Sequence, residues 1–227
     1  MQYPVDPFRL KSLPKWHIRR ATWTAYARVQ ETFAALSFAS ATIPIKQLND
    51  LADCPEPEKE QTAVTGLQLR YLIAALKATE SLSSTVVVEV GSYRGATTFA
   101  LASETRRPIF AIDPYTGYGG GEDDRVAFLK RVEHLPNVKH LRLTSGEAAR
   151  TWGQGNVSFV FIDAVHDYVS TSYDIEVWGQ KLMVDGLMAL HDTDNPRFPG
   201  TRKAALRALK KMDLWAHVND LVILKMR

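Results

Sequence analysis

The sequence contains one cysteine, Cys54, so no disulfide can form within the chain and no cysteine pair can hold a structural zinc ion. No apolar run approaches the roughly 20 residues that span a bilayer. The opening residues, MQYPVDPFRLK, lack the apolar centre of a signal peptide. We therefore expect a cytoplasmic protein with no membrane partner.

Net charge is also small, at +3, which does not indicate a nucleic-acid-binding protein. The basic residues near the start are interpreted as a solvated face, and no nucleic-acid partner is expected. This cluster consists of Arg9, Lys11, Lys15, Arg19 and Arg20.

The 227 residues are 45% hydrophobic and 23% charged, which is typical of a packed globular protein. A charged, proline-bearing stretch at residues 53–60 is typical of a surface linker. We expect a helical N-terminal segment over residues 1–62, acting as a lid or as a contact in a homo-oligomer, and a second domain over residues 63–227. Aromatic and apolar residues at helical spacing predict a packing face on a helix near residues 19–40: Trp23, Tyr26, Ala27, Phe33 and Leu36.

The second domain alternates short apolar runs with amphipathic stretches. Buried strands are predicted at residues 85–90, 108–113, 138–143, 157–163 and 186–191, and helices near 67–76, 96–104, 123–134, 168–182 and 201–212. This alternation predicts a Rossmann-like, doubly wound α/β sheet that is mostly parallel. The last two runs, 214–218 and 221–226, are joined too closely for a crossover helix, so we expect an antiparallel hairpin to end a seven-stranded sheet.

The first predicted strand runs into a glycine turn, EVGSYRGATT, which opens a helix. Ligands of open α/β sheets bind at this edge, where glycine lets the backbone approach them. Asp113 ends the next strand, 24 residues after Glu89, and could accept both hydroxyls of a ribose. The dinucleotide fingerprint G-x-G-x-x-G is missing, because only Gly91 and Gly95 are present. A ligand with a ribose but no pyrophosphate fits this turn better.

Together with AIDPY, TSGEA, FIDAVHDY and DGLMALHD, this turn resembles the class I S-adenosylmethionine-dependent methyltransferases, in particular the bacterial macrocin and cephalosporin-pathway O-methyltransferases. The resemblance covers about residues 65–227. It implies that Glu89, Gly91 and Gly95 line the methionine part of the cofactor, that Asp113 holds its ribose, and that Ser145, Gly146 and Glu147 lie near its adenine. The same cofactor site is expected to include Ser92, Tyr93, Thr97 and Asp163. Ser92 stands where many relatives have another glycine.

Acidic side chains also follow two later predicted strands. Asp163 ends one of them, and His191 and Asp192 end the next. Since neighbouring parallel strands lie about 4.8 Å apart, these side chains can meet on one ion, and their oxygens favour Mg²⁺. The sequence resembles the divalent-metal O-methyltransferases here as well, which implies Asp163 and Asp192 as ligands with His191 or Asp194 as the third.

His166 stands where catechol-methylating relatives carry a lysine, and Thr193 where they carry an asparagine. We expect His166 to be the general base, since its ordinary pKa near 6.5 leaves it able to accept a proton near pH 7. Asp163 would share the catalytic site. A glycine-rich loop at residues 117–121 is interpreted either as a flap over the cofactor or as a surface connection.

The expected activity is methyl transfer from S-adenosylmethionine to a small-molecule hydroxyl, assisted by the metal. Two other functions stay open: a nicotinamide-dependent oxidoreductase, which the incomplete fingerprint disfavours, and a binding protein that keeps the fold without turnover.

Overall fold

The computed structural model describes residues 16–227, apart from residues 55, 59, 83 and 117–119. Its central sheet has seven strands in the order β3-β2-β1-β4-β5-β7-β6. The strands are β1 (Thr85–Val90), β2 (Ile109–Ile112), β3 (Val138–Leu141), β4 (Asn156–Ile162), β5 (Leu182–Leu190), β6 (Met212–Val218) and β7 (Leu221–Met226). The helices are α1 (Trp16–Ser37), α2 (Gly66–Ala78), α3 (Ala96–Ser103), α4 (Glu122–Val132), α5 (Ser145–Arg150), α6 (Tyr168–Gly179) and α7 (Pro199–Ala208).

The predicted topology is confirmed. Strands β1 to β5 pair in parallel, whereas β7 pairs antiparallel with both β5 and β6. The order reverses beside β1, whose neighbours are β2 on one side and β4 on the other. Ligands of doubly wound sheets bind outside the carboxyl ends of the strands at such a point. The fold thus directs attention to the loops that follow β1, β2 and β4.

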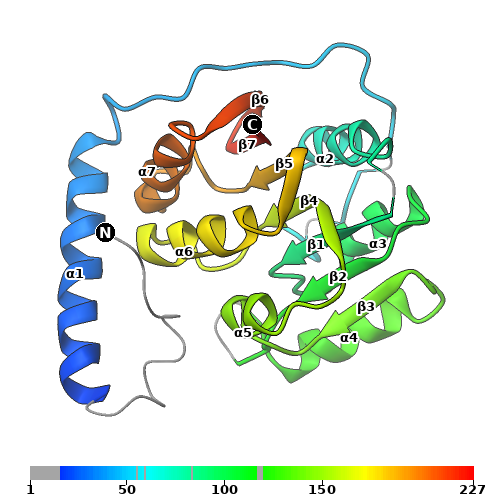
Figure 1. Cartoon of the computed structure of the whole chain (residues 1–227), viewed down its shortest axis with the longest axis horizontal. Coiled ribbons are helices and arrows are strands. Elements are labelled where there is room, and N and C mark those ends of the chain that lie inside the picture. Colours follow the sequence, from blue (N-terminus) through cyan, green and yellow to red (C-terminus); the bar gives the residue numbers. More distant parts are fainter. Residues whose placement is uncertain (1–15, 55, 59, 83, 117–119) are drawn as a thin grey trace.

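Both faces of the sheet are covered, which explains why every residue of β1 is buried (Figure 1). Side chains alternate between the faces along a strand. Val88 packs in a cluster with Trp178 of α6, while Val87 packs in another with Leu72 of α2 and Leu101 of α3. The sheet is therefore held between two helical layers, and its strand ends are fixed in place.

Several element boundaries differ from the sequence prediction by a few residues, and two of these differences exchange helix for strand. Leu182 was expected to end a helix, but it begins β5, where it pairs with Val157. Met212 was likewise expected in a helix, but it begins β6 and pairs with Met226. In both places apolar residues continue at the spacing of the preceding helix into the start of the strand. The periodicity of the side chains alone therefore could not locate the end of the helix. Pairing with the neighbouring strand decides these boundaries.

The N-terminal helix α1 packs beside α6 and α7 (Figure 1). Its Trp23, Tyr26 and Ala27 contact a buried cluster that includes Tyr168 and Tyr173. The predicted packing face holds for these three residues but not for Phe33 and Leu36, which are 59% and 77% exposed. The apolar stripe is therefore wider than the surface that α6 and α7 cover.

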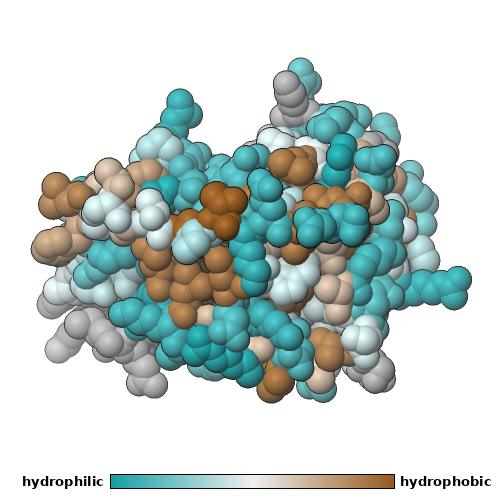
Figure 2. Space-filling view, turned by 90° about the horizontal axis from the view of Figure 1, so that it is seen from above, coloured by the Kyte–Doolittle hydropathy of each residue, from teal (hydrophilic) through white to brown (hydrophobic). Residues whose placement is uncertain are grey.

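Two features from the sequence fall outside the described residues: most of the glycine-rich loop, at 117–119, and the side chains of the basic cluster at residues 9–20. None of the described helices is both long and apolar enough to cross a membrane. Figure 2 shows a mostly hydrophilic face on which hydrophobic side chains gather in separate patches.

Candidate active site

The turn after β1 brings the ends of β1 and β4 into close approach. Gly91 has a φ of +87°, and a Cβ at this position would lie 1.9 Å from the carbonyl oxygen of Asp163. Gly95, the N-cap of α3, has a φ of +76°, and a Cβ there would lie 2.8 Å from the Phe128 ring. Only glycine fits both conditions without strain. The two predicted glycines are therefore required by the backbone of this turn.

Next to this turn lies Glu89, a carboxylic acid that is completely buried. It accepts a hydrogen bond from the hydroxyl of Thr98. Burial raises the pKa of Glu89 to about 8, the Thr98 hydrogen bond opposes the rise, and the charges of Asp163 and Asp113 add to it. Glu89 therefore holds its proton more tightly than an ordinary glutamate.

Asp113 ends β2 and orders the loops on both sides of it. Its Oδ2 accepts the backbone N–H of Tyr93 at 3.0 Å, and its Oδ1 accepts that of Tyr115 at 2.9 Å. Burial raises the pKa of Asp113, and these backbone hydrogen bonds lower it in part. Each oxygen keeps a lone pair for a ligand, so the carboxylate can bind a second partner such as a ribose diol.

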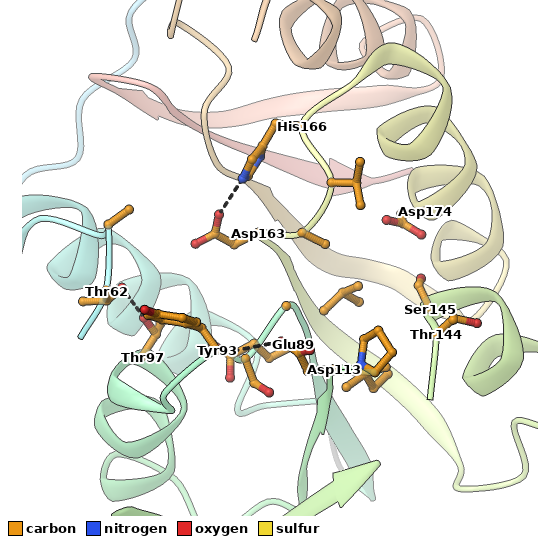
Figure 3. Close-up of a pocket in the computed structure, with 18 of the residues that line it drawn as sticks. Thr62, Glu89, Tyr93, Thr97, Asp113, Thr144, Ser145, Asp163, His166 and Asp174 are labelled. Carbon is orange, nitrogen blue, oxygen red and sulfur yellow. Dashed lines mark hydrogen bonds and ion pairs between the residues drawn. The ribbon is translucent and has the colours of Figure 1, made fainter. Parts of the chain in front are cut away.

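A cavity of about 510 Å³ opens at this edge of the sheet (Figure 3). Most of the predicted cofactor residues line it: Glu89, Gly91, Ser92, Tyr93, Thr97, Asp113, Ser145 and Asp163. The other three, Gly95, Gly146 and Glu147, are not among its described lining residues. Glu147 instead forms a capping box with Thr144 at the start of α5. Ser145 accepts a hydrogen bond from the indole N–H of Trp178 at 2.9 Å.

The sequence did not identify several other lining residues. Gln61, Thr62 and Ala63 reach the cavity from the segment before α2, where the hydroxyls of Thr62 and Thr97 lie 3.2 Å apart. Phe198 reaches it from the loop before α7, and Asp174 from α6. A capping box, Thr65 with Gln68, marks the start of α2, but no sequence signal places the segment before it at the cavity. The expected domain boundary at residue 62 thus lies at the cavity wall.

Asp163, His191 and Asp192 come together at the ends of β4 and β5. His191 Nδ1 lies 3.4 Å from Asp163 Oδ1 and 3.3 Å from Asp192 Oδ2. One possible ligand atom from each residue falls within 4.8 Å of the others, an arrangement that could hold a metal ion. The alternative third ligand, Asp194, instead pairs with Arg202 at 2.7 Å. The convergence of the strand ends is as predicted.

The charge of this cluster depends on His191, which is 3% exposed. Burial lowers the pKa of His191, but the carboxylates of Asp163 and Asp192 outweigh it and raise the pKa to about 11. Burial raises the pKa of Asp192, but the nearby His191 ring and the hydrogen bond from Asn195 bring it below its ordinary value. Without an ion, an imidazolium therefore balances the two carboxylates.

His166 completes the group, on the loop between β4 and α6. Its Nε2 lies 3.7 Å from Asp163 Oδ1 and 3.4 Å from Asp192 Oδ2. Its ring contacts that of Phe198, with 4.7 Å between centroids. Figure 3 shows His166 and Asp163 pointing toward each other at one end of the cavity, with Asp113 and Ser145 farther along. The cavity therefore connects Asp113, a carboxylate that could bind a diol, with Asp163 and His166, side chains that could bind a proton or a metal ion.

Residues 88–193 match the family model of a methyltransferase domain. This stretch runs from β1 to the residue after Asp192, so it contains both the glycine turn and the acidic cluster. This part of the chain is therefore similar to methyltransferase domains. The comparison with curated protein sequences found no match.

Solved structures of methyltransferases share the fold of this chain. The O-methyltransferase NovP has 15% sequence identity and a TM-score of 0.61, and the alignment covers 89% of this chain and 98% of NovP. CalS11, a calicheamicin methyltransferase, has 14% identity and a TM-score of 0.57, with 87% and 91% covered. Cofactor-bound Rv0187 from MTB has 16% identity and a TM-score of 0.58, with 87% and 89% covered.

Proposed function

We propose that this methyltransferase transfers a methyl group from S-adenosylmethionine to a hydroxyl oxygen of a small molecule, with the help of a divalent metal ion. The observation that carries the proposal is the continuity of one cavity, in which Asp113 and Glu89 lie at one part and Asp163 and His166 at another. Cofactor and acceptor bound side by side in such a cavity would have little translational or rotational freedom. Holding the reacting atoms in line in this way can supply much of an enzyme's rate enhancement.

The cofactor would be held by residues of this chain at three points. Asp113 has the free lone pairs to accept the ribose hydroxyls, and Ser145 lies beside the expected adenine. Asp163 places a carboxylate near the methionine part, where a sulfonium carries positive charge, and a cation bound there would also favour ionisation of the nearby Glu89. An acidic cavity favours binding of the cationic cofactor over the product that it leaves, which suits exchange of the product for a new cofactor molecule.

The residues of the acidic cluster fit a divalent ion. Both ring nitrogens of His191 are buried without a hydrogen-bond partner among the described residues, although two carboxylates lie close to Nδ1. Two carboxylates and one imidazole suit Mg²⁺ or, because of the nitrogen, Mn²⁺. When bound, such an ion would lower the pKa of a hydroxyl that coordinates it.

His166 is the group placed to take the hydroxyl proton. Its Nε2 points toward Asp163 and Asp192, so a hydroxyl held at the cluster would lie within its reach. The ring is about a quarter exposed, which gives the proton a route to solvent. The ring contact with Phe198 restrains its rotation. In this proposal His166 binds the proton while Asp163 and Asp192 hold the acceptor oxygen through the ion.

The fold is shared with NovP, an O-methyltransferase, and with CalS11, a calicheamicin methyltransferase. This likeness is consistent with a small-molecule acceptor. The proposal can be tested by incubating the enzyme with methyl-labelled S-adenosylmethionine and a panel of diols, catechols and sugars, with Mg²⁺, Mn²⁺ or a chelator. We expect label on oxygen in at least one acceptor, lost with the chelator and in His166→Gln. Transfer only to amines, or transfer indifferent to the chelator, would contradict it.

A further inference from the structure

Glu31 of α1 lies where two other helices begin. Its Oε1 accepts the backbone N–H of Tyr168, the first residue of α6, and the carboxylate also accepts the backbone N–H of Gly200 in the first turn of α7. The first N–H groups of a helix have no partner within it, and the helix dipole favours a negative charge there. One carboxylate therefore caps two helices at once.

The approach is so close that residue 200 must be glycine. A Cβ on Gly200 would lie 2.1 Å from Glu31 Oε1 and 2.3 Å from the backbone nitrogen of Tyr168. Alanine is otherwise the better helix former. The glycine is thus explained by the space that the Glu31 carboxylate needs between α6 and α7.

The two capped helices continue loops that reach the active site. His166 lies two residues before Tyr168, and Phe198 lies two residues before Gly200. The rings of His166 and Phe198 contact each other, and His166 Nε2 lies 3.4 Å from Asp192 Oδ2. The same two chain segments therefore meet twice, once through the Glu31 carboxylate and once through the ring pair. A change in spacing at the first contact must alter the second.

We propose that Glu31 is a positioning residue of the active site: by joining the backbones of Tyr168 and Gly200, it sets the orientation of the His166 ring against Phe198. The geometry of this link stands on the contacts above, while the role of His166 as base rests on the proposed function. The N-terminal helix then supplies part of the support of the active site and is more than a cover over it.

The test compares Glu31→Ala, Glu31→Gln and Gly200→Ala with Gln30→Ala as the matched control. Gln30 is the neighbour of Glu31 on α1, and its Oε1 accepts a hydrogen bond from Lys203 of α7 at 2.8 Å. Removing it weakens the contact between α1 and α7 without touching either helix start. NMR of protein with ¹³C-labelled histidine reports the His166 ring, assigned by its loss in His166→Gln.

In the wild type, the His166 ring protons should show cross-relaxation to the Phe198 ring and a shift caused by it. We expect Glu31→Ala and Gly200→Ala to lose both signals, Glu31→Gln to recover them in part through its one oxygen, and Gln30→Ala to keep them. Wild-type signals in Glu31→Ala, or equal loss in Gln30→Ala, would overturn the proposal. If Glu31→Ala does not fold, Gly200→Ala and Glu31→Gln decide the question by the same criteria.

Binding of S-adenosylhomocysteine to the same variants separates this proposal from the proposed function. Apart from Asp163, which follows β4, the residues expected to hold the cofactor lie in or after β1, β2 and β3, away from the Glu31 link, so affinity should match the wild type in all of these variants. If the wild type does not bind S-adenosylhomocysteine, the proposed function is contradicted. The NMR signals of the His166 ring would still test the positioning role of Glu31 independently. Parallel loss of affinity and ring signals in Glu31→Ala would mean general loosening and would overturn the positioning role.

Discussion

Glu89→Gln should make the protein more stable at alkaline pH than at acidic pH, relative to the wild type. Glu89 is completely buried at the end of β1 and its pKa is raised from 4.5 to about 8, chiefly by burial. Glutamine keeps an oxygen that can accept the Thr98 hydrogen bond but carries no charge. The substitution therefore removes the cost of ionising a buried group and little else.

The sign and size follow from the two pKa values. A group whose folded-state pKa is raised contributes stability below the unfolded value, and this contribution is lost as the pH rises through the folded value. At about 1.4 kcal/mol per pH unit, the interval from 4.5 to about 8 corresponds to about 5 kcal/mol in full. Most of it develops between pH 5 and 8, where wild-type stability should fall by about 3 kcal/mol relative to Glu89→Gln.

Urea denaturation followed by circular dichroism at several pH values between 5 and 8 measures this difference. Glu133→Gln is the matched control, since Glu133 is exposed at the end of α4. The control should track the wild type at every pH. A free-energy difference between wild type and Glu89→Gln that stays constant over this range would refute the reasoning, because Glu89 would then ionise without a burial cost.

Three further predictions concern the site. Gly91→Ala should destabilise the protein by about 1–3 kcal/mol in urea denaturation, because φ is +87° and the new Cβ meets the Asp163 carbonyl at 1.9 Å. An unchanged midpoint would contradict this. Asp113→Asn should weaken S-adenosylhomocysteine binding about tenfold in calorimetry, as expected for loss of a charged hydrogen-bond acceptor, and wild-type affinity would exclude the ribose role. Asp163→Ala should abolish the heat of Mn²⁺ binding, whereas Asp194→Ala should retain it. The reverse result would identify Asp194 as the ligand.

Most of the sheet could be predicted from the sequence because β1, β2 and β4 are buried on both faces and are mainly apolar. The edge strand β3 was also predicted as a buried strand, but none of its four residues is buried. The hairpin of β6 and β7 was predictable for a simpler reason, since two residues, Asn219 and Asp220, cannot hold a crossover. The short helix α5 was missed because its six residues are too few to show a helical period. The capping box of Thr144 and Glu147 marks the start of α5 in the sequence, but Glu147 was predicted to be part of the cofactor site.

The candidate site was predictable wherever its residues follow strand ends. Asp113, Asp163 and Asp192 could be placed together because parallel strands end at one edge of the sheet. Contacts between segments distant in sequence could not be predicted in this way. Neither Phe198 beside His166 nor Glu31 between α6 and α7 carries any local pattern, since each contact depends on how α1 and α7 pack in three dimensions.

The central claim, that the cavity at the end of β1 binds S-adenosylmethionine, is tested most directly by calorimetry of the wild-type chain with S-adenosylhomocysteine and, separately, with NADH. We expect saturable binding of S-adenosylhomocysteine at one site per chain and no heat of binding with NADH. Binding of NADH without binding of S-adenosylhomocysteine would contradict it.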